Sequence, residues 1–102
     1  MEKNKKIRLT NREIETIKRV AKEIFSNNTK VYLFGSRTNI NKKGGDIDLL
    51  IIPENKIDLF NKRLKYLVKL KMELGEQKID VVIPDYDSKR ITNIALKTGV
   101  LL

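Results

Sequence analysis

The sequence predicts an α/β fold of the α+β type, a small mixed β-sheet flanked by helices in the order α-β-β-α-β-α. Three segments have apolar residues at the spacing of an amphipathic helix. Three short runs between them are rich in β-branched and apolar residues and end at Gly or Pro, as strands do. The chain has 102 residues with no internal repeat or linker, so we expect a single domain over residues 1–102.

The first helix follows a basic segment. Residues 1–9 carry four Lys or Arg and few apolar side chains, so we expect a flexible arm. Thr10 and Glu13 have the spacing of a capping box, which marks a helix start, and apolar residues recur from there to Phe25. The first helix is therefore expected over residues 11–25.

Three strands are expected, over residues 30–34, 46–52 and 79–83. The first, KVYLF, ends at Gly35, and a proline closes each of the other two. The polar segment between the first two strands, GSRTNINKKGG, is expected to form a loop.

A long second helix is expected over residues 57–74 and a short third helix over residues 88–97. Gly75 and Gly99 follow these helices as stop signals. The last residues, 100–102, are apolar, and we expect them to pack against the domain. The inward face of the second helix is expected to carry Phe60, Leu64, Leu67 and Val68.

The composition removes several kinds of chemistry. Without Cys or His, the chain has no disulfide, no thiol nucleophile, no imidazole base and no Cys- or His-ligated metal. Catalysis would have to use carboxylates, hydroxyls, Lys, Arg or a cation held by oxygen, such as Mg²⁺, Mn²⁺ or Ca²⁺. The net charge of +9 favours anionic partners, although solubility alone also accounts for it. The aromatic content of 6% is low for a platform that stacks single-stranded nucleic acid.

No segment resembles a membrane span. The longest uninterrupted apolar run covers residues 49–52, and no apolar stretch of a signal peptide follows the basic N-terminus. Together with the absence of Cys, this predicts a soluble cytoplasmic protein without a membrane partner.

Three acidic residues on the expected strands are the main catalytic candidates. Asp46 and Asp48 are two positions apart, so they project from the same face with Cβ atoms about 6.5–7 Å apart. Carboxylates at that spacing repel each other unless a cation lies between them. Asp80 is the only polar residue of its strand, and it joins them if the two strands are neighbours. Solvated acids on an exposed sheet face are the alternative for all three.

A Gly35-Ser36-Arg37 turn follows the first expected strand. Gly allows backbone to approach a ligand closely, and a strand–turn–helix start is a phosphate-binding arrangement. A plain turn with a helix cap is the alternative. Arg37, Lys42 and Lys43 could contact phosphates or form a solvated basic loop, and the Lys-rich segment 62–71 is expected to be mostly a solvated helix face.

Taken together, these features resemble the DNA-polymerase-β-like nucleotidyltransferase superfamily, and most closely its minimal nucleotidyltransferase (MNT) domains. The family pattern is matched by Phe34-Gly35-Ser36, then Asp46-Ile47-Asp48-Leu49, then Ile79-Asp80-Val81. The segments GSR, DIDLL, IDVV and the final ALKTGVLL are also similar to that family. One position departs from it, because many relatives have Ser or Thr where this chain has Gly45.

The resemblance implies an Mg²⁺-dependent nucleotidyltransferase that transfers an NMP from an NTP to a hydroxyl. The NTP is ATP, which donates AMP, or another NTP. Asp46, Asp48 and Asp80 would bind two Mg²⁺ ions, and Asp80 would help to deprotonate the attacking hydroxyl. Gly35 and Ser36, with Arg37 beside them, would hold the triphosphate. It also implies a small helical HEPN-type partner protein that carries the acceptor, with this chain as the antitoxin of a toxin–antitoxin pair.

Two other functions remain open at this point. The chain could be a catalytically silent antitoxin that acts by binding alone. It could also be a basic nucleic-acid-binding module, although its low aromatic content weighs against that function.

Overall fold

The computed structural model describes residues 7–41, 44–84 and 86–102. The α+β fold class and the expected order of helices and strands are confirmed, with a 3₁₀ turn and a short fourth strand in addition. The elements are α1 (Asn11–Phe25), β1 (Lys30–Phe34), the 3₁₀ turn η1 (Gly35–Thr38), β2 (Ile47–Ile52), α2 (Leu59–Leu74), β3 (Ile79–Val82), α3 (Lys89–Thr98) and β4 (Val100–Leu101).

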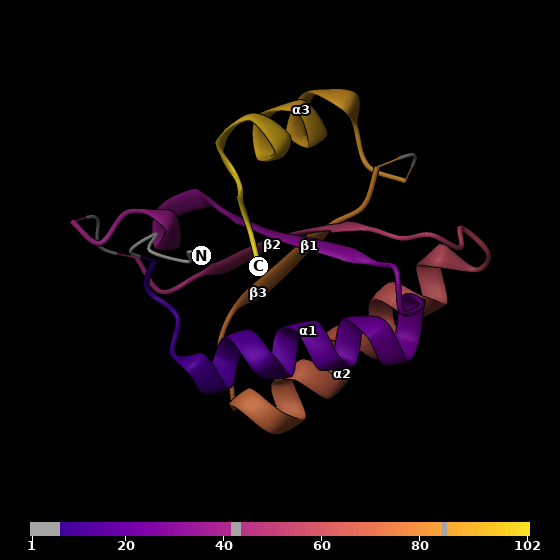
Figure 1. The fold of residues 1–102 in the computed structure, drawn as a ribbon, viewed down its shortest axis with the longest axis horizontal. Coiled ribbons are helices and arrows are strands. Elements are labelled where there is room, and N and C mark those ends of the chain that lie inside the picture. The colour runs from indigo at the N-terminus through magenta and orange to yellow at the C-terminus, as the bar shows by residue number, and fades with distance from the viewer. Residues whose placement is uncertain (1–6, 42–43, 85) are drawn as a thin grey trace.

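The molecule has three layers, with a mixed sheet between two layers of helices. The strand order is β3-β2-β1-β4. β1 is antiparallel to both of its neighbours, whereas β2 and β3 are parallel and are joined through α2. Helices α1 and α2 lie on one face of the sheet and α3 lies on the other (Figure 1). The acid-bearing strands β2 and β3 are therefore direct neighbours.

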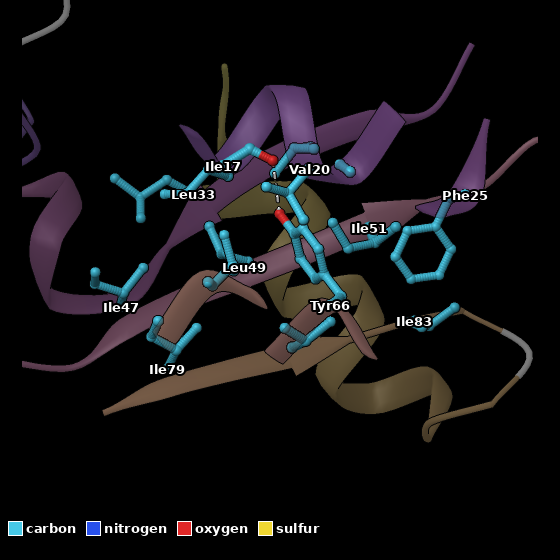
Figure 2. Close-up of a cluster of buried hydrophobic side chains, with 14 residues drawn as sticks. Ile17, Val20, Phe25, Leu33, Ile47, Leu49, Ile51, Tyr66, Ile79 and Ile83 are labelled. Atoms are coloured by element: carbon cyan, nitrogen blue, oxygen red, sulfur yellow. Dashed lines mark hydrogen bonds between the residues drawn. The ribbon is translucent and has the colours of Figure 1, made fainter. Parts of the chain in front are cut away.

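The main core lies between the sheet and the α1–α2 pair. Alternate residues of β2, such as Leu49, project into it and are fully buried. The Tyr66 ring of α2 packs edge-on against Phe25, with ring centroids 5.6 Å apart. Its buried hydroxyl donates a 2.9 Å hydrogen bond to the Ile17 carbonyl of α1 (Figure 2). This bond satisfies the phenol and fixes the two helices to each other.

The start of the described chain is attached to the domain. The expected flexible arm covers residues 1–9, of which residues 1–6 lie outside the described ranges. Ile7 and Leu9 are partly buried against the core, and the Arg8 guanidinium donates a 2.7 Å hydrogen bond to the Gly44 carbonyl. The described part of this segment therefore packs against the domain.

The prediction of which face of α2 packs inward was wrong. The fully buried residues of the helix are Tyr66 and Leu70, and only Leu67 of the expected set packs against the core. The exposed remainder is Phe60, Leu64 and Val68. The helix carries two apolar stripes, and its spacing alone cannot say which of them faces the sheet.

The C-terminal residues pack as expected, but as a strand. β4 extends the sheet because Tyr32 pairs with Leu101 and Leu33 with Val100. Two residues are too few to give a strand pattern in a sequence. Within the described ranges, none of the helices is both long and apolar enough to cross a membrane.

Candidate active site

Two of the expected acids lie side by side at the centre of the site. Asp48 of β2 and Asp80 of β3 are register partners in the parallel pair. Register partners project from the same face of a sheet. Their neighbours Leu49 and Val81 are buried in the core on the α1–α2 side, so both carboxylates project from the opposite face. α3 covers part of that face.

The third acid lies at the beginning of the same strand. Asp46 immediately precedes β2, where the Ile47 amide donates a 2.9 Å hydrogen bond to the Lys78 carbonyl. The Asp46 carboxylate is 3.7 Å from the Lys78 ammonium. Both side chains are substantially exposed, so this ion pair is a weak one that a stronger cation could displace.

The electrostatics of the site centre on Asp48. Partial burial raises the pKa of this carboxyl, and the negative charges of Asp80 and Asp46 raise it further. The Lys78 ammonium acts in the opposite direction but has the smallest effect. The site thus concentrates carboxylates that destabilise one another, the arrangement that a bound cation relieves.

Gly35 packs directly against Asp48. Its φ is +80°, a backbone conformation that glycine adopts without strain. A Cβ on this residue would collide with the Asp48 carboxylate oxygen. The turn after β1 therefore reaches Asp48 only because Gly35 has no side chain.

A second glycine, next to the position that departs from the family pattern, shapes the loop before Asp46. Gly44 has a φ of +144°, and a Cβ there would lie 2.8 Å from the Ser36 hydroxyl oxygen. The loop before β2 therefore folds back onto the turn that carries Ser36. Gly45 has no atom within 4 Å of its Cβ position, so a side chain would fit there.

The Arg37 guanidinium is engaged by the protein itself. Its Nη1 donates to the Arg8 carbonyl at 2.8 Å, and its Nη2 donates to the Gly45 carbonyl at 3.0 Å and to the Gln77 side chain at 3.3 Å. Gln77 in turn donates to Glu13 at 3.2 Å. Arg37 thus joins the segments that precede β2 and β3. Its assignment to phosphate binding stays a prediction.

The donor set suits an oxygen-seeking divalent cation. Carboxylates are the ligands that Mg²⁺ prefers, and Asp48 and Asp80 present two of them together. Within residues 7–41, 44–84 and 86–102, no three acidic side chains converge closely enough to hold an ion as they stand. Asp46, turned toward Lys78, would have to reorient to complete the set.

Sequence reasoning missed two residues around the acids. Lys78 and Gln77 directly precede β3, and no motif marks them. The signal that could have found them is position, because residues just before neighbouring parallel strands meet at one sheet edge. The two lysines expected near phosphate, Lys42 and Lys43, lie outside the described residues.

A mixed sheet that places paired aspartates beside a glycine–serine turn is the arrangement of a nucleotidyltransferase domain. The chain belongs to the family described as polymerase beta, nucleotidyltransferase, whose model matches residues 4–102.

Solved structures show the same fold. Two crystal structures of the toxin–antitoxin complex MntA-HpeT match, one a tyrosine-to-alanine variant and the other a double aspartate-to-glutamate variant. The first is 21% identical with a TM-score of 0.68, over 92% of this chain and 71% of that one. The second is 18% identical with a TM-score of 0.69, over 91% and 71%. No curated protein matches the chain significantly.

Proposed function

We propose that this protein transfers an NMP, AMP from ATP, to a hydroxyl group of a partner protein in a reaction that depends on Mg²⁺. The observation that carries the proposal is the register pairing of Asp48 with Asp80 beside Gly35. Family membership supports the reaction class. ATP as the donor implies a cytoplasmic location.

The acids and the turn have separate roles in this reaction. Asp46, Asp48 and Asp80 would hold two Mg²⁺ ions, and Gly35 with Ser36 would hold the triphosphate. When bound, the ions would polarise the α-phosphate and stabilise charge on the leaving pyrophosphate. The acceptor oxygen forms a bond to the α-phosphorus. At the same time, the bond between the α-phosphorus and the oxygen that bridges to the β-phosphate breaks, and pyrophosphate leaves. Asp80, whose side chain is exposed, accepts the proton of the hydroxyl.

We further propose that the acceptor lies on a HEPN-type helical protein and that this chain is the antitoxin of the pair. Both structural neighbours are toxin–antitoxin complexes, and their fold matches over more than nine-tenths of this chain. Modification of a hydroxyl on the partner would then inactivate the partner.

The test is transfer of label from ATP to the partner. The chain, a HEPN-type partner and Mg²⁺ are incubated with ATP labelled at the α-phosphate, and label on the partner is measured. Asp46→Asn should reduce transfer by at least about a hundredfold, because it removes a carboxylate from the metal set. Asp58→Asn, a matched change at the start of α2, should leave transfer unchanged.

Two outcomes would contradict the proposal. Partner binding that is insensitive to Asp46→Asn, without any label transfer, would identify a silent antitoxin that acts by binding alone. Label on RNA in place of protein would move the acceptor to nucleic acid.

A further inference from the structure

One face of α2 carries an apolar stripe that the domain leaves largely exposed, although the Phe60 ring lies 6.3 Å from that of Tyr86 between centroids. Its members follow one another at intervals of four residues, which places them along one side of the helix. The exposed fractions are 52% for Phe60, 46% for Leu64, 56% for Val68 and 78% for Met72. Met72 lies twelve positions after Phe60, which makes the stripe about 18 Å long. We call these four residues the α2 stripe.

The stripe continues into the seam between the two helices of that layer. Ile24 of α1, together with Leu64 and Val68, lines a shallow hollow of about 480 Å³, and the stems of Lys65 and Lys69 complete it. Single exposed apolar residues are ordinary on a protein surface, but a continuous apolar stripe beside a hollow is typical of a docking surface. The shape, a ridge with an adjoining groove, fits the side of another helix.

Lysines flank the stripe on both sides. Lys65 and Lys71 lie three residues before and after Val68, one on each side of the stripe, and both are exposed. Lys69 is already paired with Glu23, at 3.3 Å. A second copy of this chain would bring the same lysines together, in a chain whose net charge is +9. The surface therefore complements acidic residues and opposes self-association.

We propose that the α2 stripe docks a helix of a partner protein that has an apolar ridge flanked by Asp and Glu. Helix α2 lies on the face of the sheet opposite α3 (Figure 1), and Asp48 and Asp80 project on the α3 side. A partner helix held on α2 therefore leaves the acids open. Docking does not depend on nucleotidyl transfer, so each of the two proposals can fail without the other.

The probes are two synthetic helical peptides with the same leucine ridge, one flanked by Glu and the other by Lys. Binding to the full chain is followed by fluorescence anisotropy. The Glu peptide should bind and the Lys peptide should not. Leu64→Asp with Val68→Asp should weaken binding of the Glu peptide by more than about tenfold.

A charge reversal gives an independent check on folded protein. Lys65→Glu with Lys71→Glu should exchange the preference, so that the Lys peptide binds better than the Glu peptide. The matched control, Lys89→Glu with Lys97→Glu on α3, makes the same change of charge on the other face and should leave the preference unchanged. Asp46→Asn should bind the Glu peptide as the unmodified chain does.

Several results would overturn the proposal. They are equal binding of the two peptides, binding of neither, and Glu-peptide binding that survives the two Asp substitutions in the stripe. A dimer in sedimentation that Val68→Asp dissociates would show that a second copy covers the stripe.

Discussion

At the scale of single residues, the site depends on how closely the chain approaches Asp48. A side chain at position 35 would enter the space that the Asp48 carboxylate occupies. The positive φ of Gly35 also suits glycine. The sequence indicated this turn from a Gly-Ser pair after a strand. The contact with Asp48 follows only from the pairing of Phe34 with Asp48 between β1 and β2.

Gly35→Ala should damage both stability and activity. The positive φ costs about 1–2 kcal/mol for an L side chain, and the new Cβ displaces the Asp48 carboxylate. A displacement of about 1 Å is enough to reduce transfer by about a hundredfold. Thermal unfolding and label transfer measure the two effects. Gly75→Ala is the matched control, because Gly75 also has a positive φ but nothing lies within 4 Å of its Cβ position. A Gly35→Ala variant with full transfer activity would show that the contact does not position Asp48.

Asp48→Asn should stabilise the protein when divalent ions are absent. Burial and the neighbouring acids raise the pKa of Asp48, so the folded state holds this proton more tightly than the unfolded state. The free energy of unfolding therefore falls as pH rises from about 4, the ordinary Asp value, through the raised pKa. At pH 7 and without divalent ions, we expect the variant to be more stable by less than about 1 kcal/mol, because solvent screens a carboxyl that is only partly buried.

The pH and metal dependence of that gain provide the controls. Near pH 3 the carboxyl is protonated in both states, so the difference in stability should disappear. Added Mg²⁺ should raise the melting temperature of the unmodified chain more than that of Asp48→Asn. A variant that is less stable at pH 7 without divalent ions would contradict the electrostatic account.

At the scale of elements, the site is assembled by contacts between the segments that precede β2 and β3. Arg37 of the 3₁₀ turn donates to Gly45 and Gln77, which lie just before those strands. The planar guanidinium reaches both because its donors diverge in one plane. In the sequence, Arg37 suggested phosphate binding, because a basic side chain after a glycine turn can either bind phosphate or hydrogen-bond to the protein itself.

Arg37→Lys tests which use is correct. A single ammonium cannot replace three divergent hydrogen bonds, so a structural Arg37 predicts a loss of about 1–2 kcal/mol of stability without ATP. Gln77→Ala should cost less, and the double variant should lose less than the sum of the two. Denaturant unfolding of the four proteins measures this coupling. Unchanged stability with a raised KM for ATP would instead assign Arg37 to the phosphates.

The helices show where local patterns suffice. The capping box of Thr10 and Glu13 is present with both of its hydrogen bonds, and α1 has the expected bounds. The bounds of α2 were close to those expected, but the face of the helix that packs against the core differs from the expected one. Tyr66 lies on the inner face of α2 and is fully buried. Its hydroxyl donates a hydrogen bond to the Ile17 carbonyl of α1. That acceptor belongs to another helix, so no pattern within α2 could indicate it.

At the scale of the whole molecule, the three layers separate two surfaces. The acids project from one face of the sheet beside the Gly35 turn, whereas the α2 stripe lies on the outer side of the opposite layer. A protein that modifies a partner can use such an arrangement to hold the partner without covering the acids. The charge of +9 adds long-range attraction for anionic partners.

The sequence by itself determined the order of the helices and strands and their approximate bounds, and it singled out Asp46, Asp48 and Asp80 as candidate site residues. These depend on side-chain periodicity, turn chemistry and residue type, all of which act over a few neighbouring positions. Only the tertiary structure decided that Asp48 and Asp80 are register partners, that Arg37 joins segments 29 and 40 positions away, and which stripe of α2 is exposed. Those outcomes depend on which distant elements pack together, because burial and hydrogen bonding are satisfied by partners that local patterns do not specify.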